Sequence, residues 1–242
     1  MNKQVYYWST IIVMTVVVVI GWLTVSNNGS TSGNNNQIIN ETQQNVGIQN
    51  TSENNRMATQ NSSLTHYLEE QKLAMDTMMT EMKNIPHTGD PAIDFLYGMI
   101  PHHESAIAMS KSYLKYGGNS VELKQMAEDI IKTQGTEIEQ MQSMIQKLEA
   151  NIQNDETKEM EYLNAYNKML EAHGASHNMS TPNSVEEAFA EGMIMHHEMA
   201  IQMAETVLNY TKNEEIINMA QKIIDMQNKE IAQMTEIMNN MQ

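Results

Sequence analysis

A segment of twelve residues occurs twice in this chain and limits its possible folds more than any other feature. Residues 98–109 read Gly-Met-Ile-Pro-His-His-Glu-Ser-Ala-Ile-Ala-Met, and residues 192–203 read Gly-Met-Ile-Met-His-His-Glu-Met-Ala-Ile-Gln-Met. Each copy follows a Phe, Phe95 or Phe189, and the two copies lie 94 residues apart. A match of this length indicates an internal duplication, so the fold must contain two similar halves.

Helical spacing gives the repeated segment a chemical meaning, because residues three and four apart share one face of a helix. The two faces carry the same residue types in the same order: Met99, His102 or His103, Ala106 and Met109 in the first copy, and Met193, His196 or His197, Ala200 and Met203 in the second. Thioether and imidazole together are the ligand set expected for Cu(I), with Ag(I) as its chemical mimic. Adjacent helical residues point about 100° apart. We therefore expect one His of each pair to face the stripe and the other to flank it, and the sequence leaves open which.

The amino-acid composition favours metal binding over an ordinary packed core. A Met stripe at helical spacing also fits an ordinary core. The chain has 24 Met, however, more than twice its number of Leu, although Leu is normally among the commonest residues. It has no Cys, which excludes disulfides and thiolate metal sites. Met can bind Cu(I) in an oxidising compartment without forming disulfides.

Charge and spacing exclude several other functions. The formal net charge is −16, so nucleic acid is not expected as a partner. A zinc protease needs His-Glu-x-x-His, and Ile107 and Ile201 stand where the second His would be. A di-iron bundle needs Glu-x-x-His, which no His here satisfies. Glu104 and Glu198 follow the histidines and would either orient an imidazole or remain solvated. We therefore expect no enzymatic activity.

The N-terminal part of the chain is expected to lie at a membrane. Residues 8–25 form a run without charge that is long enough for a membrane span, with Lys3 before it and Trp8 and Trp22 near its ends. We interpret residues 1–25 as a transmembrane signal anchor rather than a cleaved signal peptide, with the soluble part extracytoplasmic, in the periplasm or at the cell surface. Residues 26–63, rich in Asn, Ser and Thr, read as a flexible tether.

The remaining chain reads as two helical halves, residues 64–150 and 151–242. Apolar periodicity and turn residues predict six helices: 64–84, 92–116 and 121–149, then 156–172, 184–210 and 213–241. Asp90 and Pro91 should open the second of these as cap and first-turn residue. Each half thus has a short helix, a His-His helix and a long helix. We expect an all-α protein whose two helical hairpins form an antiparallel four-helix bundle with one shared core and a pseudo-twofold axis. The short helices should pack outside the bundle or across one end.

The twin Gly-Met-Ile-x-His-His-Glu-x-Ala-Ile-x-Met segments, each followed by a long helix with spaced Met, resemble the domain-of-unknown-function family 305 (DUF305), which includes periplasmic copper-binding proteins of the CopM type. The resemblance covers about residues 64–242 in two tandem copies. It implies a ferritin-like four-helix bundle that binds Cu(I) or Ag(I) in copper tolerance. By position, it implies these ligands: Met99, His102, His103 and Met109, then Met193, His196, His197 and Met203, and on the long helices Met126, Met141, Met219 and Met234.

We therefore predict an exported, membrane-tethered bundle that binds Cu(I) or Ag(I) for sequestration, tolerance or hand-off to a copper-handling partner protein. One alternative is a structural or partner-binding bundle whose Met-rich faces form an adaptable surface. Another is a ferritin-like metalloenzyme that uses His and Glu. His173, His177 and Met179 form a candidate for a separate loop site.

Overall fold

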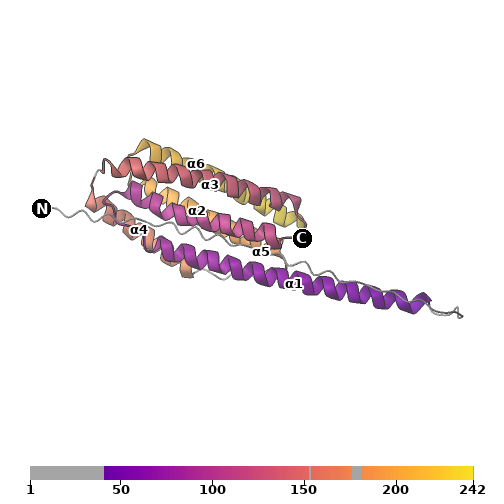
Figure 1. Cartoon of the computed structure of the whole chain (residues 1–242). Coiled ribbons are helices and arrows are strands. Elements are labelled where there is room, and N and C mark those ends of the chain that lie inside the picture. The colour runs from indigo at the N-terminus through magenta and orange to yellow at the C-terminus, as the bar shows by residue number, and fades with distance from the viewer. Residues whose placement is uncertain (1–40, 153, 176–180, 242) are drawn as a thin grey trace, which may run out of the picture. The chain divides into compact units, whose positions relative to one another are not determined.

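The computed structural model describes residues 41–152, 154–175 and 181–241. Within these ranges it contains helices and no strand, which confirms the all-α class. The helices are α1 (Glu41–Met82), α2 (Pro91–Tyr116), α3 (Val121–Glu149), α4 (Glu156–Ala175), α5 (Val185–Leu208) and α6 (Glu214–Met241), shown in Figure 1. The chain divides into two units, Met1–Gln44 and Asn45–Gln242, and the second unit contains both repeated segments.

The predicted anchor at residues 1–25 lies outside the described residues, as does the tether up to residue 40. Among the helices that the structure describes, none is long and apolar enough to cross a membrane.

Four helices of the two hairpins begin at residues whose side chains cap them. The side chains of Asp90, Ser120 and Ser184 accept hydrogen bonds from backbone N–H groups in the first turns of α2, α3 and α5. Asn213 does the same for α6. Such caps satisfy N–H groups that the helix itself cannot pair. The predicted opening of α2 by Asp90 and Pro91 is therefore confirmed.

Helix α1 begins at Glu41, earlier than the expected start at residue 64 and within the stretch predicted as a tether. No Pro occurs in this helix, so nothing in the backbone stops it from extending beyond its packed part. Burial nevertheless starts where the apolar periodicity starts. Met57 is exposed, and Tyr67 is the first buried side chain in the described part of α1.

The helices are arranged in three layers (Figure 1). Helices α2 and α3 pack as one hairpin, α5 and α6 pack as the other, and the hairpins meet mainly through α2 and α5. Helices α3 and α6 also touch each other and cover one side of this pair. On the other side α4 packs on α5 and α2. Helix α1 lies there too, since Gln71 donates to the Ala188 carbonyl of α5 and Glu70 accepts from Lys115 of α2.

Two glycines at matching positions of the repeat let the outer helices approach closely. A Cβ atom on Gly98 would lie 2.7 Å from the hydroxyl of Tyr166 on α4. A Cβ atom on Gly192 would overlap the amide of Gln71 on α1. A side chain at either position would therefore force Tyr166 or Gln71 to move, and the rigid Tyr166 ring gives way less easily than the flexible end of Gln71.

Buried apolar side chains form two separate cores, not the single shared core expected from the sequence, because buried histidines lie between them. The Phe95 core contains Met78, Met82, Phe95, Leu96, Met99, Met141, Tyr162, Tyr166, Met199, Met203, Val207, Met219 and Ile223, among others. The Phe189 core contains Tyr67, Ala106, Met109, Tyr113, Leu123, Met126, Ile130, Phe189, Met193 and Met234, among others. The start of α2 thus shares a core with the end of α5, and the end of α2 with the start of α5. The two His-His helices therefore run antiparallel. Matching residues of the repeat, such as Phe95 and Phe189, lie in different cores.

Candidate metal centre

All four repeated histidines are fully buried, between the two cores. On α2, Met99 belongs to the Phe95 core and Ala106 to the Phe189 core, so His102 and His103 lie between them. His196 and His197 take the same position on α5. We call these four residues the histidine layer. Isolated buried polar groups are costly, so a layer of four imidazoles requires an explanation.

His102 and His196 meet each other where α2 packs on α5. Their ring centroids are 3.7 Å apart. Nε2 of His102 lies 3.0 Å from the backbone oxygen of His196, and since a carbonyl can only accept, this nitrogen carries the proton. Neither ring nitrogen of His196 has a hydrogen-bond partner among the described residues. These two rings therefore lie at the centre of the interface between the hairpins.

His103 and His197 instead face the long helix of their own hairpin. Nε2 of His103 donates to Oε2 of Glu137 on α3 at 3.0 Å. Nε2 of His197 donates to Oε2 of Glu230 on α6 at 2.6 Å. Because adjacent helical residues diverge by about 100°, one histidine of each pair lies between the hairpins and the other faces the long helix of its own hairpin. The sequence predicted this divergence but not that both members of each pair would be fully buried.

Hydrogen bonding through Nε2 leaves the other ring nitrogen for a different partner. In a neutral imidazole with the proton on Nε2, Nδ1 carries a lone pair. Nδ1 of all four histidines is buried without a hydrogen-bond partner in the described part of the chain. A carboxylate or carbonyl behind one ring nitrogen, with the lone pair of the second nitrogen left for the metal, is the usual arrangement of a metal-ligating histidine.

The surroundings favour the neutral form of the two central rings. Burial lowers the pKa of His102 well below its ordinary value, and the nearby histidines His196, His103 and His197 lower it further. Burial likewise lowers the pKa of His196, with His197 and His103 adding to the effect. A neutral imidazole is the form that binds a metal ion.

Glu137 remains ionised despite its burial. Burial alone raises the pKa of its carboxyl, but the interactions with His103 and Lys222 outweigh this and hold the pKa below its ordinary value. Lys222 Nζ lies 3.5 Å from Glu137 Oε1. A carboxylate is therefore available to compensate positive charge next to the layer.

Two further polar residues belong to the same helix faces as the two carboxylates. Gln134 and Gln227 lie one helical turn before Glu137 and Glu230, and both are buried. The side-chain oxygen of each has no hydrogen-bond partner among the described residues. The polar region between the cores thus extends onto α3 and α6.

The eight proposed thioether ligands fall into two groups of four on either side of the histidine layer. Met99, Met141, Met203 and Met219 lie in the Phe95 core, and Met109, Met126, Met193 and Met234 lie in the Phe189 core. All eight are at least nine-tenths buried. Each Met of one group corresponds, in the repeat, to a Met of the other group. Each helix of the two hairpins contributes one Met to each group. The structure therefore places all twelve residues that the sequence suggested in the buried interior of the helical unit, as one layer and two flanking groups.

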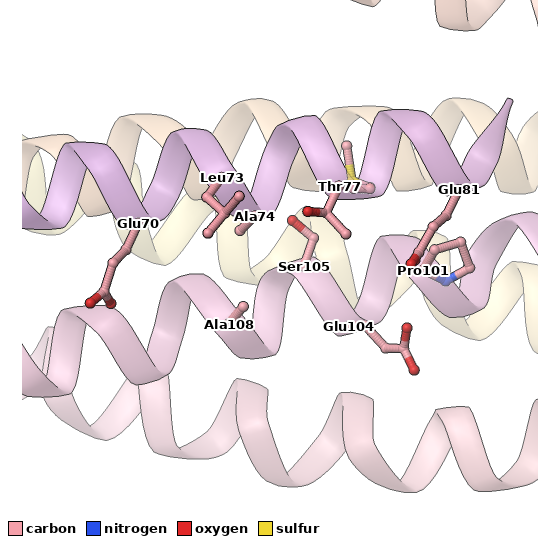
Figure 2. A pocket seen from close by; sticks show the side chains of 10 residues that line it. Glu70, Leu73, Ala74, Thr77, Glu81, Pro101, Glu104, Ser105 and Ala108 are labelled. Carbon is pink, nitrogen blue, oxygen red and sulfur yellow. The ribbon is translucent and has the colours of Figure 1, made fainter. Parts of the chain in front are cut away.

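Glu104 and Glu198, which the sequence offered as orienting partners, do not contact the histidine layer. Both are exposed. Glu104 lines a groove of about 470 Å³ between α1 and α2, together with Glu81 and Pro101 (Figure 2). Partial burial there, and the charge of Glu81, raise the pKa of Glu104. Glu104 points about 200° away from His102 and about 100° away from His103 around the helix, so the partners of the histidines come from α3 and α6 instead.

The proposed separate loop site lies mostly outside the described residues. His177 and Met179 belong to residues 176–180, which the structure does not describe. His173 lies in the last turn of α4, where its Nδ1 is 3.3 Å from the Met169 carbonyl oxygen. Across residues 41–152, 154–175 and 181–241, no group of three or more His, Asp or Glu side chains is arranged to hold a metal ion.

A protein-family model described as "Domain of unknown function (DUF305)" matches the chain over two overlapping stretches, residues 22–145 and 93–238. The first stretch contains one His-His motif and the second contains both. No curated protein matches the chain.

Several solved structures of one protein are similar to the chain. CopM in the Ag-bound form obtained by soaking has 29% sequence identity and a TM-score of 0.47, covering 62% of this chain and 95% of that chain. CopM in the apo form has 27% identity and a TM-score of 0.47, covering 62% and 96%. CopM in the Cu(II)-bound form has 27% identity and a TM-score of 0.48, covering 62% and 97%.

Proposed function

The chain belongs to the DUF305 family, and we propose that it binds Cu(I), with Ag(I) as a mimic, between its two helical hairpins. The observation that carries this proposal is the histidine layer. Four buried imidazoles keep Nδ1 without a hydrogen-bond partner in the described residues, and each of the two hairpins sets a carboxylate behind its second histidine. A merely structural histidine would be expected to satisfy both ring nitrogens.

The thioethers favour a soft ion over a hard one. Sulfur of Met is an uncharged, polarisable donor that suits Cu(I) and Ag(I), whereas Mg²⁺, Ca²⁺ and Mn²⁺ prefer oxygen. Each side of the layer has four buried Met, one from each helix of the two hairpins. A site that uses imidazoles of the layer and thioethers of one flank would have enough ligands for Cu(I), without any Cys.

Charge favours a monovalent ion. Imidazole and thioether ligands are neutral, so a bound cation brings uncompensated charge into a buried site, and this is costly unless an anion lies close. Glu137 and Glu230 supply one carboxylate behind His103 and one behind His197. Each carboxylate matches the single charge of Cu(I) or Ag(I) better than the double charge of Zn²⁺.

The setting of this site follows from the sequence. Residues 1–25 tether the protein to a membrane, and the helical unit lies outside the cytoplasm as a ferritin-like four-helix bundle made by α2, α3, α5 and α6. A membrane-tethered bundle without a catalytic group suits sequestration, tolerance or hand-off of copper to a partner protein, not turnover of a substrate. Support for the export comes from the uncharged run at residues 8–25 and from the absence of Cys in the sequence.

An anaerobic competition titration tests the proposal. The full chain in detergent is titrated with Cu(I) against a chromogenic chelator, next to a variant with His102, His103, His196 and His197 all changed to Gln. A control variant with His66→Gln and His87→Gln removes two exposed histidines. We expect the wild type and the control to withdraw Cu(I) from the chelator, and the layer variant to bind at least about tenfold more weakly.

A folded wild type that leaves the chelator fully loaded would contradict metal binding and would favour the structural or partner-binding alternative. Circular dichroism establishes that each variant is folded. Preferential tight binding of Zn²⁺ would point to a metalloenzyme instead.

A further inference from the structure

The two His–Glu pairs differ in how far they are from solvent. The side chain of Glu137 is 6% exposed, and Lys222 of α6 covers its second oxygen at 3.5 Å. The side chain of Glu230 is 17% exposed. Matching positions of the repeat thus have the same hydrogen bond to histidine but different surroundings.

Glu230 lines an open groove between α3 and α6 with a volume of about 550 Å³. Its charged lining residues are Glu122, Asp129, Lys229, Glu230 and Glu236. Four carboxylates and one ammonium group give the groove a net negative charge. Glu230 is the residue that joins this groove to the histidine layer, because its Oε2 accepts the hydrogen bond from buried His197.

The matching region around Glu137 is closed by lysines. The repeat places Lys222 at the position of Asp129, and Lys147 at the position of Asn240 in the groove. Lys222 pairs with Glu137, and Lys147 pairs with Glu215. At one end of the α3–α6 surface each lysine is therefore neutralised by a carboxylate, whereas the lining of the groove at the other end carries a net negative charge.

The open groove also presents sulfur. Met126 and Met226 line it beside the carboxylates. Met126 is 8% exposed and belongs to the group of four Met in the Phe189 core. A soft ion in this groove would therefore meet a carboxylate that contacts the histidine layer and a thioether that belongs to one of its flanks.

We infer that the groove at Glu230 is the entry and exit route for a soft monovalent cation, and that the matching surface at Lys222 is closed to it. This inference rests on the proposed function. A cleft lined by one sign of charge raises the local concentration of a counter-ion and its association rate by about 10 to 10³-fold. At the matching surface the carboxylates are paired with lysines, so this attraction is lost.

Exchange of the two matching residues tests the route. The full chain is mixed rapidly with aqueous Ag(I) in chloride-free nitrate buffer, quenched on a thiol resin, and assayed for bound silver over time. Asp129→Lys gives the open groove the lysine of the closed surface, and Lys222→Asp is the matched control for reversal of charge. Asp129 has no place among the twelve proposed ligands, so the amount bound at equilibrium should not change.

We expect Asp129→Lys to slow silver loading about tenfold at an ionic strength of about 0.01 M, and the difference to shrink near 1 M, where charges are screened within about 3 Å. Lys222→Asp should load at least as fast as the wild type. A second variant, Glu122→Gln with Glu236→Gln, should slow loading in the same direction. It replaces exposed residues, so it keeps the test valid if Asp129→Lys does not fold.

Equal loading rates of wild type and groove variants at low ionic strength, with normal final stoichiometry, would overturn the route and leave the proposed function intact. Slower loading of Lys222→Asp than of Asp129→Lys, with the wild-type amount of silver bound at equilibrium in both, would also overturn it. A folded wild type that binds no silver at all would overturn the proposed function and the route together.

Discussion

At the two ends of the helical unit, the Phe95 and Phe189 cores pack aromatic, aliphatic and thioether side chains against one another, whereas the histidine layer between them holds imidazoles. Single hydroxyls such as those of Tyr113 and Tyr162 are also buried without a partner in the described residues at the ends. In the layer, by contrast, every imidazole has at least one unpartnered nitrogen within the described part of the chain. An unsatisfied buried polar group costs about 1–3 kcal/mol. The ends therefore stabilise the fold, and the unsatisfied groups in the middle reduce its stability.

The largest effect should come from the ends. Phe189→Ala removes a fully buried ring that stacks on Tyr113 with ring centroids 4.3 Å apart. We expect the free energy of unfolding to fall by about 3–5 kcal/mol, because the cavity adds to the lost burial. Phe95→Ala, at the matching position, should cost a similar amount. Chemical denaturation measures both, with Leu73→Ala, an exposed residue, as the control. A cost for Phe189→Ala as small as that of the control would contradict this assignment of stability to the ends.

The middle should respond in the opposite direction. Changing His102 and His196 together to Leu removes two buried imidazoles that meet at the interface. We expect the metal-free protein to become about 1–3 kcal/mol more stable, because unsatisfied polar groups are replaced by apolar ones. Its affinity for Cu(I) should fall. Denaturation in the presence of a copper chelator measures the first effect, and His87→Leu serves as an exposed control. A loss of stability would mean that these histidines hold the hairpins together.

Removal of the carboxylates should weaken metal binding without a comparable loss of structure. Glu137→Gln and Glu230→Gln each keep an oxygen that can accept from the histidine but remove its charge. Loss of such a partner typically lowers metal affinity about 10–100-fold. Glu104→Gln is a matched control, since Glu104 follows the same histidine pair yet lies in the outer groove (Figure 2). Competition titration with Cu(I) should leave the control unchanged. If Glu104→Gln weakened binding as much as Glu137→Gln, the assignment of partners would be wrong.

The smallest effect is a pH dependence of stability. The folded-state pKa of His102 and of His196 is lowered, so between that pKa and the unfolded value near 6.5 the unfolded chain binds more protons. Stability should be complete above about pH 6.5 and should fall as pH decreases, by up to about 1.4 kcal/mol per pH unit for each histidine. Denaturation of the metal-free protein between about pH 7.5 and pH 5 measures this slope.

The His102→Leu, His196→Leu variant is the reference for that slope. Burial raises the pKa of Asp94 to about 6, with Thr88 hydrogen bonds opposing the rise. A raised carboxyl pKa stabilises the folded protein as pH falls, which is the opposite sign. Because Asp94 is present in both proteins, the difference between their slopes isolates the histidines. Identical slopes would contradict the low pKa of the two rings.

The fold was largely readable from local signals. Asp90 and Ser120 mark helix starts because their side chains can accept hydrogen bonds from unpaired N–H groups in the first turn, and the structure confirms both. The start of α1 was not readable, since polar residues in 41–63 neither stop a helix nor anchor one by packing.

The candidate site was only half readable. Histidines and methionines could be identified because the repeat carries them in register. Glu137 and Glu230 were missed, because a hydrogen bond between two helices depends on how the helices pack and leaves no spacing pattern around the histidine. One signal was available. The repeat also preserves Gln-x-x-Glu, at residues 134–137 and 227–230, on the apolar face of each long helix.

The antiparallel contact of α2 with α5 has a consequence for the origin of the molecule. His102 meets His196, its own counterpart in the repeat, as a residue does in the isologous interface of a C2 homodimer. A single half could complete the same histidine layer only by pairing with a second copy of itself. In such a homodimer the two ends of the α3–α6 surface would be identical by symmetry. Joining the halves in one chain removes that constraint, so one end can carry Asp129 while the other carries Lys222. Covalent fusion therefore allows the two ends of a symmetric assembly to carry different charges.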